Sequence, residues 1–316
     1  MKKILSIYLL LFLTRTQKRV NNYVMNYKHY ATDFNLAKEP IAECLKEGTL
    51  KLILGAGISM DFGLPNWPDL IFKCINGLLL AKGESLIERE DFDKDISRYE
   101  RKLNQYDSEH NYSRVVRDSL YSGMPPNLED LLLKGAPGLL AIAALCTGTT
   151  RGRVRHIFTL NFDDILEQYL ALLGLKVNTG SSFKRDNYNA DIRIDHLHGY
   201  LPRNEDNLSD IVFSPRSYTT RYAQTHGFDD WFVSQWVGSK LLLIGLSGSD
   251  QLLQTNAIKH KSLLGNDEIH GYALLTPNAY EDNHLDLVNN GICPIKIPRE
   301  EIPKFLLSCC QIASDL

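Results

Sequence analysis

The chain has 316 residues, which suits one large α/β domain or two smaller ones and is long enough to bury a sizeable core. A hydrophobic content of 44% and a charged content of 23% are ordinary for a soluble globular protein. The formal net charge of −3 gives the surface as a whole no basic character, so we expect no direct binding of nucleic acid.

The six cysteines follow no pattern of a metal site or a disulfide framework. They contain no Cys-x-x-Cys pair, which argues against a zinc ribbon, and their spacing is not that of a small secreted scaffold. We therefore expect idle thiols in a reducing compartment, a cytoplasmic location and no bound metal. The six residues are Cys44, Cys74, Cys146, Cys293, Cys309 and Cys310.

The N-terminal segment resembles a targeting signal that is incomplete. Lys2 and Lys3 precede the apolar run ILSIYLLLFL (4–13), as in the charged and apolar regions of a signal peptide. No small-residue cleavage site follows, and the run is too short to span a bilayer as a helix. Met25 offers a second possible start. We interpret residues 1–30 as an N-terminal extension or short docking helix, and we expect no membrane association.

The next part of the chain predicts one strand between two helices and then a helical insertion. Residues 35–47 and 66–80 have helical patterns, and Pro68 suits the first turn of the second helix. The apolar run 51–54 ends in glycines, as buried strands do. Residues 84–150 show helical patterns and no convincing strand, so we predict a helical insertion there.

Beyond this insertion, apolar runs typical of buried strands alternate with helical patterns. This alternation predicts an α/β domain, over residues 31–316, with a doubly wound parallel sheet that binds ligands outside the carboxyl ends of its strands. The predicted strands are 154–160, 192–199, 210–214, 241–248, 272–276 and 293–297. The predicted helices are 163–174, 228–239, 251–264 and 279–291.

The stretch LILGAGISMDFGLP (52–65) places a glycine turn directly after the first strand. Such a turn can hold a pyrophosphate against a helix N-terminus, or it can be a turn and nothing more. A P-loop would need a lysine that is absent here. A dehydrogenase fingerprint would need a glycine where Met60 stands and a second strand with an acidic residue soon afterwards, whereas helices follow.

A second cluster of polar side chains follows the predicted strand 154–160. Asn161 lies at the strand end, where a side-chain amide can orient a ligand hydroxyl or a water. Asp163 and Asp164 come next, at the start of a predicted helix, and their carboxylates suit either a ligand site or a simple helix cap.

Two histidines form a third cluster in the predicted strand 192–199. His196 and His198 alternate along the strand and would therefore point to the same face. A metal pair would lack a marked third ligand. We interpret His198, which precedes Gly199, as a general base or acid, and His196 as a residue that packs in the core or supports the site through its neighbours.

The stretch IGLSGSD (244–250) forms a fourth cluster at the end of another predicted strand. Its glycines, hydroxyls and carboxylate can hold a ribose or a phosphate. These residues are Gly245, Ser247, Gly248, Ser249 and Asp250. Because the carboxyl ends of parallel strands share one edge of the sheet, we expect the four clusters to define one crevice.

With these four clusters the sequence resembles the sirtuin superfamily. The matching motifs follow the family's order over about residues 48–300. They are G-A-G-I-S (55–59) with G-L-P (63–65), T-x-N-x-D (159–163), H-G (198–199) and G-x-S (245–247). The resemblance implies a Rossmann-like sheet that binds NAD and cleavage of the bond between nicotinamide and ribose.

The resemblance also implies roles for single residues. The glycine turn would hold the NAD phosphates, Asn161 and Asp163 would lie beside the nicotinamide ribose, and His198 would be the base. The catalytic residues are then Asn161, His198 and Asp163. The NAD-binding residues are Gly55, Ala56, Gly57, Ser59, Pro65, Asn161, Asp163, Gly245, Ser247 and Asp250.

Two departures from the family's pattern narrow the expected activity. Protein-deacylase sirtuins carry a four-cysteine zinc module after the H-G motif, and that module is missing here. Their first motif continues into an acidic–aromatic–arginine triplet, where this chain has Asn66, Trp67 and Pro68. The variant motifs resemble bacterial sirtuin-like proteins that consume NAD in antiphage defence. We therefore expect a hydrolase that converts its substrate NAD to ADP-ribose and nicotinamide.

Other activities and the expected partners follow from the same resemblance. The alternatives are an NAD-dependent protein deacylase, a non-catalytic sensor of NAD or ADP-ribose, and cyclisation of ADP-ribose at the same site. Because constant loss of NAD would be toxic, we expect a silent resting state. We also expect a homo-oligomer or a partnership with a separate ATPase or nucleic-acid-sensing defence protein, while the sequence does not show the trigger.

Overall fold

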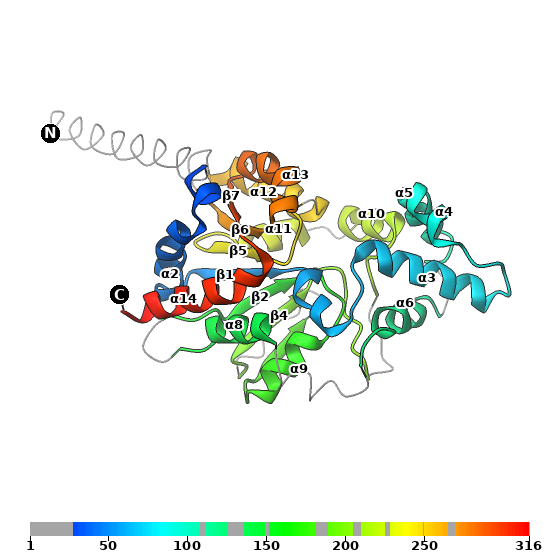
Figure 1. The fold of residues 1–316 in the computed structure, drawn as a ribbon, viewed down its shortest axis with the longest axis horizontal. Coiled ribbons are helices and arrows are strands. Elements are labelled where there is room, and N and C mark those ends of the chain that lie inside the picture. The colour runs from blue at the N-terminus through cyan, green and yellow to red at the C-terminus, as the bar shows by residue number, and fades with distance from the viewer. Residues whose placement is uncertain are drawn as a thin grey trace. The chain divides into compact units, whose positions relative to one another are not determined.

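The computed structural model describes most of the chain (Figure 1). The described residues are 28–107, 111–125, 136–148, 152–180, 189–204, 210–224, 228–248, 250–264 and 269–315. The apolar run 4–13, Met25 and Ser249 lie outside them. Within the described ranges, no helix is long and apolar enough to cross a membrane.

Seven short strands form one sheet in the order β3-β4-β2-β1-β5-β6-β7. The pairs β1–β2, β2–β4, β3–β4, β5–β6 and β6–β7 are all parallel. The strands are β1 (Leu50–Leu54), β2 (His156–Thr159), β3 (Val177–Gly180), β4 (Ile192–His196), β5 (Lys240–Ile244), β6 (Gly271–Leu275) and β7 (Ile292–Lys296). The predicted α/β fold with a Rossmann-like parallel sheet is confirmed.

The chain divides into two compact units, which we describe separately. Unit 1 consists of Met1–Lys51, Thr147–Arg153 and Phe232–Leu316, and it carries β5, β6 and β7. Unit 2 consists of Leu52–Cys146 and Val154–Trp231, and it carries β2, β3, β4 and most of β1.

In unit 2, helices surround a set of buried strands. Leu52, Ile157 and Ile194, on three neighbouring strands, are fully buried, as expected of a parallel sheet covered on both faces. The helices of this unit are α3 (Trp67–Ala81), α4 (Arg89–Lys94), α5 (Ile96–Leu103), α6 (Tyr112–Tyr121), α8 (Pro137–Cys146), α9 (Ile165–Leu172) and α10 (Pro215–Gln224). Helix α3 packs against α5 and α6 (Figure 1).

Helix α3 shows why this segment is helical. The Asn66 side chain accepts a hydrogen bond of 2.9 Å from the Asp69 N–H, which caps the helix N-terminus. Pro68 occupies the first turn, where a missing N–H costs nothing. The predicted helix over 66–80 is therefore confirmed.

In unit 1, helices from distant parts of the sequence pack together. The unit contains α2 (Lys38–Lys46), α12 (Gln251–Leu264), α13 (Pro277–Asn289) and α14 (Ile302–Asp315), while α11 (Phe228–Ser234) runs from unit 2 into unit 1. Helix α14 lies beside α2 (Figure 1). Ile41 and Leu45 on α2 and Phe305 and Leu306 on α14 are at most 1% exposed, so this contact is part of the core.

Several sequence predictions were wrong in detail. The predicted strand 210–214 is irregular: its apolar side chains are buried, and the Val212 N–H donates to the His198 carbonyl oxygen. Helix α10 follows because the Ser214 hydroxyl accepts from the Ser217 N–H at 3.0 Å, as a helix cap does. The sequence analysis did not predict β3, α10 or α14. The strand predicted over 192–199 ends at His196, and the one predicted over 241–248 ends at Ile244.

The range 84–150 holds α4, α5, α6 and α8 and, within its described residues, no strand. The six cysteines are free thiols, and all except Cys44 are buried.

Candidate functional site

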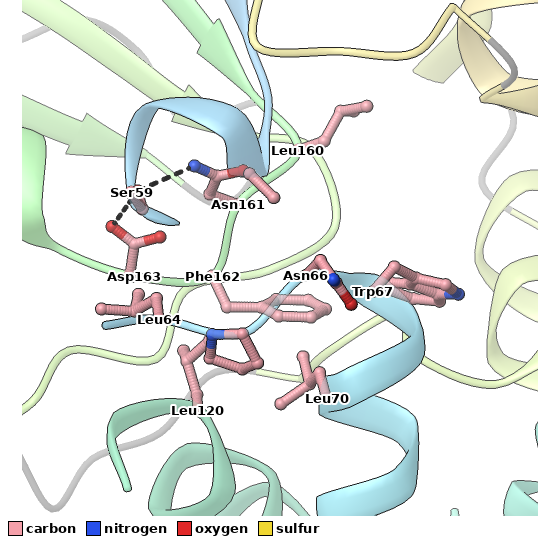
Figure 2. A pocket seen from close by; sticks show the side chains of 12 residues that line it. Ser59, Leu64, Asn66, Trp67, Leu70, Leu120, Leu160, Asn161, Phe162 and Asp163 are labelled. Atoms are coloured by element: carbon pink, nitrogen blue, oxygen red, sulfur yellow. Dashed lines mark hydrogen bonds between the residues drawn. The ribbon is translucent and has the colours of Figure 1, made fainter. Parts of the chain in front are cut away.

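A pocket in unit 2 is lined by the segments that follow β1 and β2, by the start of α3 and by one residue of α6 (Figure 2). Its polar lining comes from Ser59, Asn66, Asn161 and Asp163. The remaining lining residues are Ala56, Leu64, Pro65, Trp67, Leu70, Leu120, Leu160 and Phe162. The pocket therefore lies at the carboxyl ends of two neighbouring parallel strands, where ligands of such sheets bind.

The glycine turn after β1 does not lead straight into a long helix. Gly55 is extended, and two short 3-10 turns follow at Ala56–Ile58 and Met60–Phe62. No long helix begins at this turn, since the first long helix after β1 is α3, where a helix was predicted. The turn contributes Ala56 and Ser59 to the lining of the pocket.

Gly63 closes this turn against α6. Its φ of 81° lies in the left-handed region, and a Cβ at this position would lie 2.4 Å from the Gly123 carbonyl oxygen. Only glycine fits both the backbone conformation and the space. Leu64 and Pro65, which follow, can then line the pocket.

Asn161 joins the two strand ends. Its side-chain amide donates to the Gly55 carbonyl oxygen and to the Ser59 hydroxyl, each across 3.2 Å. Its main-chain N–H donates to the Thr159 hydroxyl at 3.1 Å. The residue is only 9% exposed, so these contacts fix the plane of its amide at the base of the pocket.

Asp163 is buried beside Asn161 and shares Ser59 with it. The Ser59 hydroxyl donates to Asp163 Oδ1 across 3.1 Å, and the Ile165 N–H donates to the same oxygen across 3.2 Å. Burial and the charge of Glu167 raise the pKa of Asp163 to about 7, although its hydrogen bonds act in the opposite direction. The carboxyl group therefore titrates near neutral pH while it also helps to cap α9.

Asp164 has a structural role that the sequence left open. Its carboxylate accepts from the Tyr121 hydroxyl at 2.9 Å, from the Gln168 amide at 2.7 Å and from the Arg203 N–H at 3.2 Å. Tyr121 lies on α6, Gln168 on α9 and Arg203 after β4. Asp164 therefore holds three segments together behind the pocket.

The two histidines of the third cluster have different surroundings. His196 is the last residue of β4, whereas His198 lies in the turn beyond it, so the predicted alternation along one strand does not reach His198. The His198 ring lies 6.2 Å from that of Tyr218, the residue is 6% exposed, and it does not line the pocket. His196 Nδ1 lies 2.7 Å from the Asn161 carbonyl oxygen.

The structure brings together six of the predicted site residues. Gly55, Ala56, Ser59, Pro65, Asn161 and Asp163 all line the pocket or contact a residue that lines it. Gly57 lies within the first 3-10 turn. Gly245, Ser247 and Asp250 follow β5 in unit 1, where the Asp250 side chain accepts from the Leu253 N–H at 3.1 Å. Their binding of NAD stays a prediction.

Sequence reasoning missed Glu167, whose Oε1 lies 2.6 Å from His196 Nε2. It is an ordinary acidic residue in a helical pattern, and only the fold turns it toward β4. Nor did the sequence indicate a role for Trp67, the aromatic side chain at the rim of the pocket. Trp67 is 41% exposed, and its Nε1–H donates to Glu100 Oε1 across 3.0 Å. Its ring packs edge-on against that of Phe213, with 5.0 Å between the ring centroids.

In the described part of the chain, no group of three or more His, Cys, Asp or Glu side chains could hold a metal ion. The two buried carboxyl groups of this region contact other side chains: Asp163, which lines the pocket, contacts Ser59, and Glu167 contacts His196.

The parallel sheet and the pocket at its carboxyl edge define an α/β protein with a candidate ligand site at the place where such sheets bind ligands. Residues 155–295 match the family model of the SIR2-like domain, and this match includes Asn161, Asp163 and His198. Over residues 155–295 the chain is therefore similar to sirtuin-like proteins. SIR2-like domains bind NAD, and this similarity supports an NAD-dependent enzymatic activity in general. A search of curated proteins found no match.

Proposed function

We propose that this protein hydrolyses NAD to ADP-ribose and nicotinamide. The observation that carries the proposal is the contact set of Asn161, whose amide is fixed by Gly55 and Ser59 next to the buried carboxyl group of Asp163. A buried amide and a buried acid at the base of a pocket suit a sugar ring that becomes positively charged during reaction.

The reaction does not need an acid catalyst to protonate the leaving group. Nicotinamide leaves NAD as a neutral molecule from a pyridinium, and it takes the electron pair of the breaking C1′–N bond with it. The ribose passes through an oxocarbenium-like state, and the oxygen of a water then bonds to C1′ while that water loses a proton. The protein has to position the ribose, stabilise its positive charge and accept the proton.

Asn161 is proposed to orient the ribose or the attacking water. Its amide nitrogen points to Ser59, which leaves the amide oxygen on the other side (Figure 2). That oxygen can accept a hydrogen bond from a ribose hydroxyl or from the water. Because the amide is already fixed, no reorganisation is needed when the substrate binds.

Asp163 is proposed to stabilise the positive charge, and His198 to take the proton. The ionised Asp163 carboxylate, at 6% exposure, would act in a medium of low dielectric constant, where its attraction for a cation is strong. His198 follows the carboxyl end of β4, and a neutral imidazole is a suitable general base.

Incubation of the purified full-length chain with NAD, followed by mass spectrometry, tests the proposal. We expect nicotinamide and linear ADP-ribose in equal amounts. Asn161→Ala and His198→Ala should each reduce nicotinamide release by roughly a hundredfold or more while the chain stays folded, as circular dichroism would show. Asn178→Ala on β3 and the exposed His29→Ala are the matched controls.

The outcomes separate the other candidate activities. Full release by both the Asn161 and the His198 variant would contradict the proposal. A cyclic form of ADP-ribose would show that the activity is cyclisation and not hydrolysis. NAD binding without any product would indicate a sensor. NAD-dependent turnover of an acetylated peptide would indicate a deacylase.

We further propose that NAD depletion by this chain serves bacterial antiphage defence in the cytoplasm. This step rests on the resemblance to bacterial sirtuin-like proteins. It predicts that the chain forms a homo-oligomer, or responds to a separate ATPase or nucleic-acid-sensing protein. Measurement of cellular NAD during phage infection, with the wild type and the Asn161→Ala variant, tests the role, and light scattering tests the oligomer.

A further inference from the structure

A buried pair of charged side chains lies behind Asn161. His196 ends β4 and is 2% exposed, and Glu167 lies on α9 and is 8% exposed. His196 Nε2 is 2.6 Å from Glu167 Oε1, and His196 Nδ1 is 2.7 Å from the main-chain oxygen of Asn161. The His196 ring therefore makes two short contacts, one with the Glu167 carboxyl group and one with the main-chain oxygen of Asn161.

The partners of the ring decide where its protons are. A main-chain carbonyl oxygen can only accept, so Nδ1 of His196 carries a proton and donates to Asn161. Burial acts to lower the pKa of His196, but the charge of Glu167 and the hydrogen bonds to Glu167 and Asn161 raise it above its ordinary value. The Nδ1 proton of His196 therefore points to Asn161, while Nε2 faces Glu167.

Glu167 also acts on Asp163. Glu167 Oε2 is buried and has no hydrogen-bond partner among the described residues, so its charge is not fully neutralised locally. After burial, the charge of Glu167 is the largest cause that raises the pKa of Asp163, and His196 opposes it. Burial and the charges of Asp164 and Asp163 also raise the pKa of the Tyr121 hydroxyl. The charge of Asp163 is thus coupled to the pair.

A buried pair of this kind can contribute to stability without acting on the pocket. Strand β4 carries a second histidine–carboxylate pair, which serves as the comparison. The residue before His196 is Asp195, which points to the opposite face of the strand. Its carboxylate lies 2.6 Å from His156 Nε2 and 2.7 Å from Arg193 Nε. This second histidine–carboxylate pair is also buried on its acid side, and it lies on the opposite face of β4 from the contact between His196 and Asn161.

We propose that His196 and Glu167 are positioning residues of the pocket: His196 holds the Asn161 peptide in place, and the buried, half-partnered carboxyl group of Glu167 holds the His196 ring and acts through it and its charge on the site. The proposal rests on the proposed hydrolysis of NAD. It adds two residues to the site that touch no substrate and act through their neighbours.

The Glu167→Gln variant removes the negative charge of Glu167 and keeps the shape of its side chain. The glutamine oxygen can still accept from His196 Nε2, so the contact with the ring is kept. Loss of the negative charge lowers the pKa of Asp163, so more of Asp163 is ionised on the acid side of neutrality. The acid limb of the rate–pH profile then moves to lower pH.

His196→Gln removes the contact with Asn161 instead. A glutamine cannot reach the Asn161 carbonyl oxygen and Glu167 at once in the geometry of the ring, so Asn161 loses its support. We expect kcat for nicotinamide release to fall by about tenfold or more, while KM for NAD changes little, because positioning matters most in the transition state.

The experiment measures kcat and KM for nicotinamide release by the full chain across the pH range near neutrality. The variants are Glu167→Gln, His196→Gln and the controls Asp195→Asn and His156→Gln. The controls should lower thermal stability and leave the rate–pH profile in place. A Glu167→Gln profile that does not move, or a move of the same size in Asp195→Asn, overturns the role of Glu167.

For His196, an unchanged kcat in His196→Gln overturns the positioning role. If that variant does not fold, His196→Asn, which keeps a donor near the position of Nδ1, takes its place and should retain more kcat than His196→Ala. The contrast between the asparagine and alanine variants then decides the assignment.

A direct titration separates this inference from the proposed function. The carboxyl carbon of Asp163 is followed by NMR in aspartate-labelled protein and assigned with Asp163→Asn. A lower pKa of Asp163 in Glu167→Gln supports the coupling, and an unchanged pKa overturns it, whatever the enzyme does to NAD. Absence of nicotinamide release from the wild type would instead contradict the proposed function alone.

Discussion

The Ser59 hydroxyl donates to Asp163 across 3.1 Å, although 104 residues separate the two in the sequence. The same hydroxyl accepts from the Asn161 amide, so one small side chain connects the glycine turn after β1 to the polar segment after β2. A hydroxyl suits this position because it donates and accepts at once, which neither alanine nor a thiol does as well.

Ser59→Ala should therefore disorganise the site without unfolding it. Asp163 loses one donor and Asn161 loses one of its two acceptors. A hydrogen bond to a charged group is worth about 1.5–3 kcal/mol, so kcat for nicotinamide release should fall by roughly tenfold to a hundredfold. Ser122→Ala, whose hydroxyl donates to the Ser119 carbonyl oxygen at the end of α6, is the control. Equal rates in the two variants would exclude a role for Ser59.

Nicotinamide release should increase with pH through neutrality. The pKa of Asp163 is raised to about 7, so the carboxylate that stabilises the cationic ribose is largely protonated on the acid side and largely ionised above it. The limb should be absent in Asp163→Asn, whose residual rate should not follow this titration. Steady-state rates in buffers of constant ionic strength provide the measurement.

The same acid should limit stability at high pH. The pKa of Asp163 in the folded protein is above its ordinary value, so the buried group favours its proton, and the free energy of unfolding decreases as pH rises from about 4 to about 7. Asp163→Asn removes this cost, which is on the order of a few kcal/mol when the group is ionised. The variant should thus melt at a higher temperature than the wild type at about pH 8, with a smaller difference at about pH 5.

Thermal unfolding of Asp163→Asn at the two pH values tests this, with the exposed Asp61→Asn as the control. A gain in melting temperature of the same size at both pH values would show that the cost of ionisation is not the cause.

Two glycines with similar backbones should respond differently to a methyl group. Gly63 has φ 81° and Gly83 has φ 70°, so alanine is strained at both. At Gly83 a Cβ meets nothing within 4 Å, and Gly83→Ala should cost about 1 kcal/mol. At Gly63 it would meet the Gly123 carbonyl oxygen at 2.4 Å, so Gly63→Ala should cost a further ~1–3 kcal/mol. Equal denaturant midpoints for the two variants would contradict this.

Much of the fold could be predicted because buried parallel strands are short apolar runs. Residues such as Leu52, Phe158 and Leu242 follow this pattern, and β1, β2, β5, β6 and β7 lie where it predicted them. Strand β3 was missed because its residues are only half-buried and include polar side chains. The run 210–214 was mistaken for a strand, since burial alone makes a segment apolar whether or not it joins a sheet.

The site was predictable to the extent that its residues follow strand ends. Asn161, Asp163 and Ser59 come together as the motifs indicated. Glu167 and Tyr121 could not be found this way, because they lie on helices whose rotation about their axes is set by packing. The contact of His196 with Asn161 depends on the pairing of β4 with β2, which the order of strands in the sequence does not disclose.

The pairing of α2 with α14 has a consequence for the synthesis of the chain. On the ribosome, α2 is made before every residue of unit 2, while α14 is the last helix of the described chain. Until α14 emerges, Ile41 and Leu45 lack the surface that buries them. Unit 2 can fold during elongation, but unit 1 has to wait for α14, and until then the apolar face of the amphipathic helix α2 is exposed to nascent-chain chaperones.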